Sequence, residues 1–256
     1  MYKFIIFKVV FVLFSLPVIA QSIFLESFNP IYIDNKSIKD IQNHNNVYVR
    51  PLKYLNTPNF AELSVSEKKI KFINFILPSI LLEKNKIKKA YDYILNNYEI
   101  KHNNDTINEL FEYCNCDTKN CLLLCLKAQP NSIIIAQAAI ESGWGTSRFF
   151  IEGNNLFGVH TQSNDPNKIK AKNSSPVYVK KYNSISESIS HYLRTLASGY
   201  FYEQYRINRF NNINSIDLIN YLSMYSIRRE SYIEDLNSII IYNNLLMYDN
   251  LELIYD

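Results

Sequence analysis

The sequence has little of several features that would narrow its class. Glycine occurs 5 times and proline 8 times in 256 residues, which excludes collagen-like and low-complexity proteins. Its 27 Lys and Arg are scattered among 24 Asp and Glu, and the net charge is only +3, so we expect no nucleic-acid partner. Neither an internal repeat nor a low-complexity linker follows residue 64. One folded domain behind an N-terminal extension is therefore expected.

The first 20 residues have the pattern of a secretory signal peptide. Lys3 and Lys8 precede a short apolar run, and Val18 and Ala20 suit cleavage after Ala20. The run is shorter than the roughly 20 apolar residues that comfortably cross a membrane. The alternative is an uncleaved anchor over residues 4–20, and only then is the membrane a partner. Because no cysteine follows the cleavage region, a lipoprotein anchor is not expected. In both cases we expect the remaining chain to be periplasmic or secreted.

Cysteine is absent outside one short segment that holds all four: Cys114, Cys116, Cys121 and Cys125. In an oxidising compartment such clusters form disulfides more often than metal sites, and this spacing lacks the paired C-x-x-C knuckles of common zinc sites. Four cysteines allow three pairings, and the spacing does not select one. We expect disulfides and no metal; reactive free thiols and a metal site remain the alternatives.

The hydrophobic pattern of the first half predicts an arm followed by helices. Residues 21–63 mix Asn-rich stretches with short apolar runs, and we expect an extended, loosely packed arm at the surface. Ser64 and Glu67 then fit a capping box at the start of a helix. Pro78 should end or kink that helix before a second one over residues 79–97.

The next segment predicts a buried helix that ends at an acidic residue. Residues 130–132 have the pattern of a helix start, and residues 133–140 are apolar on nearly all sides. Gly143 and Gly145 supply the conformational freedom to end the helix. Glu141 should therefore lie at the C-terminal end of a buried helix.

Beyond this helix the pattern becomes polar and then helical again. Residues 158–182, with a turn signal at residues 164–167, predict a loop and a short β-hairpin. A second capping box at residues 184–187 starts another amphipathic helix, and the last strong helix covers about residues 231–244.

Glu141 is chemically unusual at this position. Burial removes its hydration, and the partial negative charge of a helix C-terminus further disfavours its ionised form, so both effects raise its pKa. A carboxylic acid that keeps its proton near neutral pH beside a lone Trp144 is suited to general acid catalysis, as in glycoside hydrolysis. The alternative is a structural role, in which Glu141 caps the helix or pairs with Arg148.

The string AQAAIESGWGTSRF over residues 136–149, followed by GNNLFG at residues 153–158, resembles the active-site signature of the glucosaminidase family of peptidoglycan hydrolases, glycoside hydrolase family 73. Flanking stretches resemble the Bax-like branch of that family in the same order: residues 66–78, 182–189, 192–194 and 225–233. The resemblance implies a mainly α, lysozyme-like α+β fold. A helical domain over residues 64–256 would then carry a small loop or β-hairpin lobe beside the active-site cleft.

The resemblance also implies roles for particular residues. Glu141 matches the catalytic glutamate, which acts as general acid on the glycosidic oxygen of an N-acetylglucosamine linkage. The positions that match cleft-shaping or substrate-binding residues are Trp144, Asn155, Phe157, Gly158, Tyr225 and Tyr232. Trp144 and Phe157 fit a core role equally well, and which of the two tyrosines points inward is left open.

The sequence departs from the family pattern at the second carboxylate. Asp165 is the only acidic residue between Gly158 and Tyr182, and Pro166 follows it, so a turn-forming role competes with a catalytic one. Glu187 is better explained as a capping residue. The substrate's own 2-acetamido group would remove the need for an enzymic nucleophile.

These observations predict an exported hydrolase that cleaves β-1,4 glycosidic bonds at N-acetylglucosamine in peptidoglycan glycan strands. No cofactor is implied. The alternatives are a lytic transglycosylase, which closes the sugar onto itself without water, and a catalytically weak wall-binding or regulatory protein.

Overall fold

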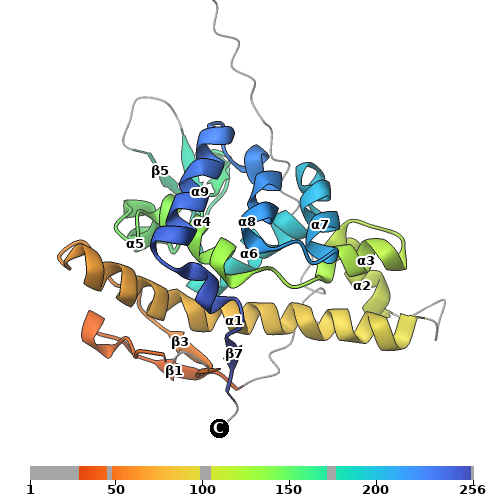
Figure 1. Cartoon of the computed structure of the whole chain (residues 1–256). Coiled ribbons are helices and arrows are strands. Elements are labelled where there is room, and N and C mark those ends of the chain that lie inside the picture. Colours follow the sequence, from red (N-terminus) through yellow and green to blue (C-terminus); the bar gives the residue numbers. More distant parts are fainter. Residues whose placement is uncertain (1–28, 45–47, 99–104, 172–176, 255–256) are drawn as a thin grey trace, which may run out of the picture.

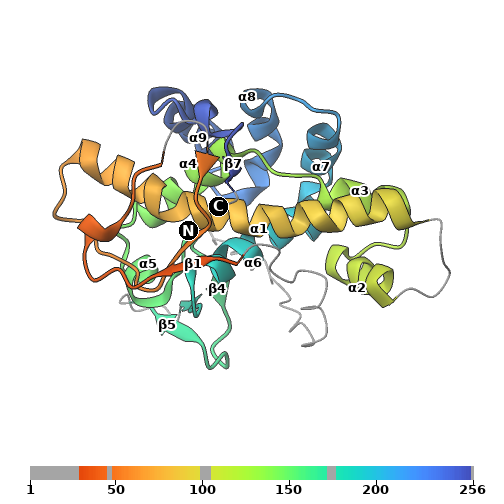
Figure 2. The ribbon, with the colours of Figure 1, turned by 90° about the horizontal axis from the view of Figure 1, so that it is seen from below.

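The computed structural model describes residues 29–44, 48–98, 105–171 and 177–254, so the predicted signal peptide lies outside the described residues. Helices dominate the architecture. A long helix, α1 (Val65–Asn97), has most other helices on one side and strands of the N-terminal arm on the other (Figure 1). The view from below shows the arm crossing over α1 (Figure 2).

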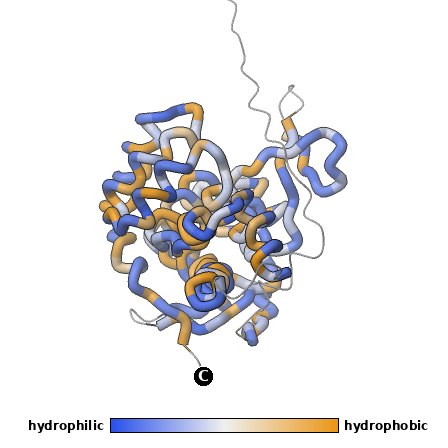
Figure 3. The backbone as a smooth tube through the Cα atoms, turned by 90° about the vertical axis from the view of Figure 1, so that its right-hand side faces the viewer, coloured by the Kyte–Doolittle hydropathy of each residue, from blue (hydrophilic) through white to orange (hydrophobic). Residues whose placement is uncertain are grey.

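The other helices surround a core between α1 and the C-terminal half. They are α2 (Asp105–Cys114), α3 (Lys119–Leu126), α4 (Asn131–Ser142), α5 (Arg148–Gly153), α6 (Ile185–Ser198), α7 (Glu203–Phe210), α8 (Ser215–Leu218) and α9 (Glu230–Tyr242). Short 3₁₀ helices are η2 (Ile38–Asp40), η4 (Tyr200–Tyr202), η5 (Ile219–Tyr225) and η6 (Leu245–Tyr248). Hydrophobic stretches gather where these elements meet (Figure 3). The prediction of a mainly helical protein is confirmed.

The start of α1 agrees with the sequence, but its course does not. Ser64 and Glu67 form the predicted reciprocal capping box. The prediction that Pro78 separates two helices is wrong, because α1 continues through it to Asn97. Pro78 has no N–H for the Asn74 carbonyl, and His44 of the arm donates to that oxygen instead, from Nε2 at 2.8 Å.

The arm is extended, as expected, but it is not loosely packed. Strand β1 (Ile31–Ile33) pairs in parallel with β3 (Leu52–Tyr54), and β2 (Tyr48–Val49) pairs in parallel with the C-terminal β7 (Glu252–Leu253). The side chains of Val49, Leu52 and Phe60 are completely buried. The short apolar runs between the Asn-rich stretches therefore insert into the core, which corrects the prediction of a loose surface arm.

The predicted hairpin is a small antiparallel sheet of three strands. Strands β4 (His160–Thr161), β5 (Lys168–Lys170) and β6 (Tyr178–Lys180) lie in the order β4-β6-β5. Val179 in the middle strand is buried, and it stands opposite His160 on one side and Ile169 on the other. The sheet begins two residues after Gly158.

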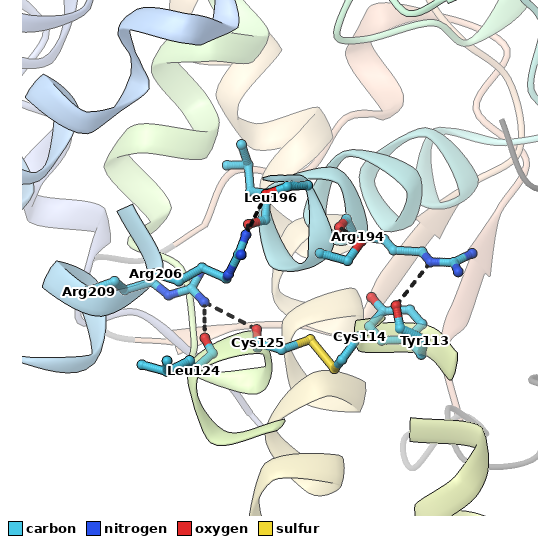
Figure 4. Close-up of a disulfide and its surroundings, with 10 residues drawn as sticks. Tyr113, Cys114, Leu124, Cys125, Arg194, Leu196, Arg206 and Arg209 are labelled. Carbon is cyan, nitrogen blue, oxygen red and sulfur yellow. Dashed lines mark hydrogen bonds between the residues drawn. A yellow bond between two sulfur atoms is a disulfide. The ribbon is translucent and has the colours of Figure 1, made fainter. Parts of the chain in front are cut away.

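The four cysteines form one disulfide. A disulfide joins Cys114 at the end of α2 to Cys125 in α3, with the guanidinium of Arg209 donating to the Leu124 and Cys125 carbonyl oxygens at 2.6 and 3.1 Å (Figure 4). Cys116 and Cys121 are half-buried free thiols. The disulfide prediction is therefore confirmed for one pair only.

Among the described helices, none is by itself both long and apolar enough to cross a membrane. Helices α3 and α4 meet those criteria only as a pair, and they are bent by 62° against each other. Almost every residue of α4 is buried inside the protein.

Candidate active site

Helix α4 places Glu141 in its last turn, as the sequence predicts. The helix ends at Gly143, which has a φ of +59°. The next turn is held by Ser142, whose hydroxyl donates to the Ala138 carbonyl at 2.6 Å and accepts from the Gly145 N–H at 3.0 Å. The backbone around Glu141 is therefore fixed by a buried serine.

The N-terminal arm supports the same turn. The ring of Phe60 lies so close to Gly145 that a side-chain carbon there would be 2.4 Å from the ring. Phe60 also packs edge-on against Phe72 of α1, with ring centroids 5.9 Å apart. A segment outside the glucosaminidase-like motif thus contacts the turn that follows Glu141.

Glu141 is half-buried between the helices and the loop that leads into β4. A side-chain carbon on Gly158 would lie 3.3 Å from Glu141 Oε2, so the absence of a side chain keeps this approach to the carboxylate open. Burial raises the pKa of Glu141, while the hydrogen bond from Tyr232 and the charge of Arg228 lower it less. The direction agrees with the sequence-based expectation of an acid that keeps its proton.

Tyr232 is the inward-pointing tyrosine, and it belongs to a buried hydrogen-bonded chain. Gln137, one helical turn before Glu141, donates from Nε2 to the Tyr232 hydroxyl at 3.0 Å. Its Oε1 accepts from the Tyr192 hydroxyl of α6 at 2.6 Å. Tyr192, Gln137 and Tyr232 are almost inaccessible to solvent. Tyr232 in turn favours the ionised form of the Glu141 carboxylate, and we name the set Tyr192, Gln137, Tyr232 and Glu141 the relay.

Aromatic rings hold the two tyrosines of the relay. Phe157 stacks on Tyr192 with ring centroids 3.9 Å apart and planes 9° apart. Tyr225 stacks on Tyr232 with centroids 5.7 Å apart and planes 12° apart. Phe157 and Tyr225, both predicted to shape the cleft, thus contact the relay, and Phe157 is almost fully buried.

Two other predicted cleft residues have clear structural contacts. Asn155 is buried and clamps the loop, because its amide donates to the Val159 and Lys180 carbonyls and accepts from the Val159 N–H at 2.7–2.9 Å. Trp144 packs edge-on against Phe72, with centroids 5.8 Å apart, under the Lys69 ammonium. Asn155 is buried with both amide hydrogens engaged, whereas Trp144 is partly exposed.

The other acidic residues near the motif have their own partners. Asp165 accepts from the Thr161 hydroxyl and from the Asn167 N–H within the turn between β4 and β5. Slight burial raises its pKa, but these bonds and nearby lysines outweigh that effect, so the pKa is lowered. Arg148, the alternative partner for Glu141, instead pairs with Glu152 at 2.9 Å.

Sequence reasoning missed three residues of the site: Gln137, Tyr192 and Arg228. Gln137 stands inside the recognised string four residues before Glu141, and this spacing places both on one helix face. Tyr192 follows the apolar pattern of its helix, which gives no sign of its hydrogen-bonding role. In the described parts of the chain, no group of three or more His, Cys, Asp or Glu side chains is arranged to hold a metal ion.

The region around Glu141 is similar to known proteins. Residues 125–245 match the model of the Glucosaminidase family, described as mannosyl-glycoprotein endo-beta-N-acetylglucosaminidase. Protein bax of Escherichia coli (strain K12) is 31% identical over 123 residues, which cover 44% of this chain. The match spans 42% of that relative's own length, less than half of it.

Two solved structures overlap the chain in part. A peptidoglycan hydrolase from Sphingomonas sp. A1 has a TM-score of 0.38 and 22% identity, covering 46% of this chain and 78% of its own. The catalytic domain of the autolysin Auto from Listeria monocytogenes has a TM-score of 0.38 and 25% identity, covering 60% of this chain and 94% of its own. The segment over residues 125–245, with Glu141 and Tyr232 inside it, thus matches the glucosaminidase family model and is similar to protein bax.

Proposed function

We propose that this protein is an exported peptidoglycan hydrolase that cleaves β-1,4 glycosidic bonds at N-acetylglucosamine, with Glu141 as the general acid. The observation that carries the proposal is the position of Glu141. A half-buried carboxyl group with a raised pKa ends a buried helix of the family's domain, beside the side-chain-free Gly158. Peptidoglycan glycan strands are the expected partner.

In the proposed reaction the Glu141 carboxyl donates its proton to the glycosidic oxygen while the bond from that oxygen to C1 breaks. Asp165 accepts hydrogen bonds within its own turn, so we assign the nucleophile to the substrate. The carbonyl oxygen of the substrate's own 2-acetamido group bonds to C1 and closes a ring. Water then attacks C1, which releases the acetamido oxygen and opens the ring, and a proton of this water returns to Glu141. Asp165 remains the candidate for an enzymic second carboxylate.

Glu141→Gln tests the proposal directly. The variant keeps the shape of the side chain but has no proton to donate, and loss of a general acid lowers rates by about 10²–10⁴-fold. Lysis of purified peptidoglycan is the measurement. Glu152→Gln is the matched control, because Glu152 is exposed and paired with Arg148, and its activity should stay at the wild-type level. Equal lysis by wild type and Glu141→Gln would remove Glu141 from the mechanism.

Mass spectrometry of the released fragments separates the alternative reactions. Reducing N-acetylglucosamine ends support the hydrolase, and anhydro-sugar ends would establish a lytic transglycosylase instead. Binding to peptidoglycan without lysis by either wild type or Glu141→Gln would favour the wall-binding role, which the engagement of Asp165 within its own turn motivates.

Export is part of the same proposal. The pattern of residues 1–20 supports cleavage after Ala20, with residues 21–63 as an N-terminal extension and residues 64–256 as the hydrolase domain. N-terminal sequencing of the protein from the periplasm or medium should begin at Gln21. A protein that retains Met1 at the membrane would indicate the anchor instead.

A further inference from the structure

Gln137 has both ends of its side-chain amide engaged by tyrosines from different helices. Tyr192 of α6 donates to its Oε1, and its Nε2 donates to Tyr232 of α9. The amide is completely buried, so neither bond can be replaced by water without opening the core. Helices α4 and α9 lie side by side (Figure 1), and Tyr232 of α9 interacts with both Gln137 and Glu141 of α4.

A phenol has one proton, and the amide determines where that proton goes. Because Gln137 donates to the Tyr232 oxygen, the Tyr232 proton is free to point at Glu141, where it stabilises the ionised carboxylate. If the amide were turned over, Tyr232 would donate to Oε1 of Gln137. It could then only accept a hydrogen bond from the protonated form of Glu141. The two amide orientations therefore favour opposite protonation states of Glu141.

The surroundings keep the relay in the first orientation. The Tyr192 ring is stacked on Phe157, and its hydroxyl donates to Oε1 of the amide. Burial and the nearby Glu141 carboxylate raise the pKa of Tyr232, so its phenol retains the proton that it donates. We propose that Gln137 is a positioning residue that aims the Tyr232 proton at Glu141, with Tyr192 fixing the amide, and that it thereby sets the acidity of Glu141. The catalytic meaning of this inference rests on the proposed function.

Other groups also face Glu141 and must be separated from this effect. Arg228 from the turn before α9 favours its ionised form, and Tyr225 from η5 lies close enough for the two to interact electrostatically. Tyr232 is the third such group. Substitutions in the relay leave Arg228 and Tyr225 in place, so a change in acidity reports on the tyrosine proton.

The experiment is a titration of the Glu141 side chain in the intact protein by ¹³C NMR, with the signal assigned by its loss in Glu141→Gln. In Gln137→Met the Tyr232 oxygen loses its donor and can accept from protonated Glu141. The pKa of Glu141 should then rise by about one unit, which is a tenfold change in proton affinity. Tyr192→Phe removes one hydroxyl and releases the amide, so a smaller rise is expected.

Gln129→Met is the matched control. Gln129 also accepts from a buried tyrosine hydroxyl, that of Tyr205, at 2.6 Å, but it lies before the start of α4 and outside the relay. It should lower the melting temperature about as much as Gln137→Met and leave the pKa of Glu141 unchanged. An unchanged pKa in a folded Gln137→Met protein would overturn the proposal, and so would an equal rise in Gln129→Met. If Gln137→Met does not fold, an unchanged pKa in Tyr192→Phe overturns it.

The titration needs no substrate, so it stands apart from the proposed function. Should Glu141→Gln retain full lysis, the proposed function fails while the titration still decides the role of Gln137. If both hold, the alkaline limb of the kcat/KM profile moves to higher pH in Gln137→Met by the same amount as the titration. Gln129→Met should leave that limb in place.

Discussion

Each end of α4 has a carboxylate beside it, but the two carboxylates are in opposite electrostatic environments. At the N-terminal end, the carboxylate of Asp249 accepts from the Ser132 N–H, the Ser132 hydroxyl and the Ser215 hydroxyl at 2.7–2.9 Å. A negative charge there also agrees with the helix dipole. At the C-terminal end Glu141 opposes the dipole and keeps a raised pKa. The Asp249 carboxylate accepts three hydrogen bonds and anchors the helix, whereas the Glu141 carboxyl group lies where its charged form is disfavoured, as the proposed general acid requires.

The largest expected effect on stability is at Asp249. Asp249→Ala removes three hydrogen bonds to a charged group and leaves the buried Ser132 N–H without a partner. We expect a loss of about 3 kcal/mol in the free energy of unfolding. Denaturant unfolding measures it, and Asp249→Asn, which keeps one acceptor oxygen, should lose less. Activity per folded molecule should be retained, and a selective loss of activity would show that the two ends are coupled.

A matched pair of serines sharpens the comparison further. Ser132 and Ser142 are both completely buried, and each hydroxyl is hydrogen-bonded at its own end of α4. Ser132→Ala and Ser142→Ala should each cost about 1–2 kcal/mol, as expected for a buried hydrogen bond whose partner is left unsatisfied. Only Ser142→Ala should also lower kcat, because it loosens the turn after Glu141. Equal kinetic effects from both would contradict the division of α4 into an anchor and a reactive end.

The smallest expected effect on the free energy of unfolding is that of Glu141→Gln, which should stabilise the protein. Because burial raises the pKa of Glu141 in the folded state, the folded protein holds this proton more tightly than the unfolded chain. Its stabilising contribution is present below the unfolded pKa of about 4.3 and is lost as the pH rises through the folded value. Glu141→Gln should therefore be more stable than wild type at pH 7 and equal to it near pH 3. Thermal unfolding at both pH values tests this sign.

The features predicted from the sequence were those that neighbouring residues determine. The capping box of Ser64 and Glu67, the end of α4 at Gly143 and the raised pKa of Glu141 depend on short spacings or on burial of one apolar run. The features that were missed depend on partners distant in sequence. The continuity of α1 through Pro78 needs His44, and no local pattern announces that contact.

The cap of α4 shows the same limit. The sequence indicates a helix start at residues 130–132, yet Pro130 provides no side-chain cap, and Asp249 supplies the acceptor from the far end of the chain. The relay was missed because Tyr192 satisfies an apolar pattern and a hydrogen-bonded function at once. A tyrosine has an apolar ring and a polar tip, and hydrophobic periodicity detects only the ring.

The partnership of Asp249 with α4 also bears on how the chain folds. Strand β2 pairs with β7, and α4 receives its N-terminal cap from Asp249. Contacts from the last few described residues therefore complete both the N-terminal arm and the central helix. Contacts between such distant segments form late, because the intervening chain must be ordered first. A chain emerging from the ribosome would therefore hold the Glu141 segment before it holds the residues that lock it. We expect the domain to close only after the segment around Asp249 and β7 has left the ribosome.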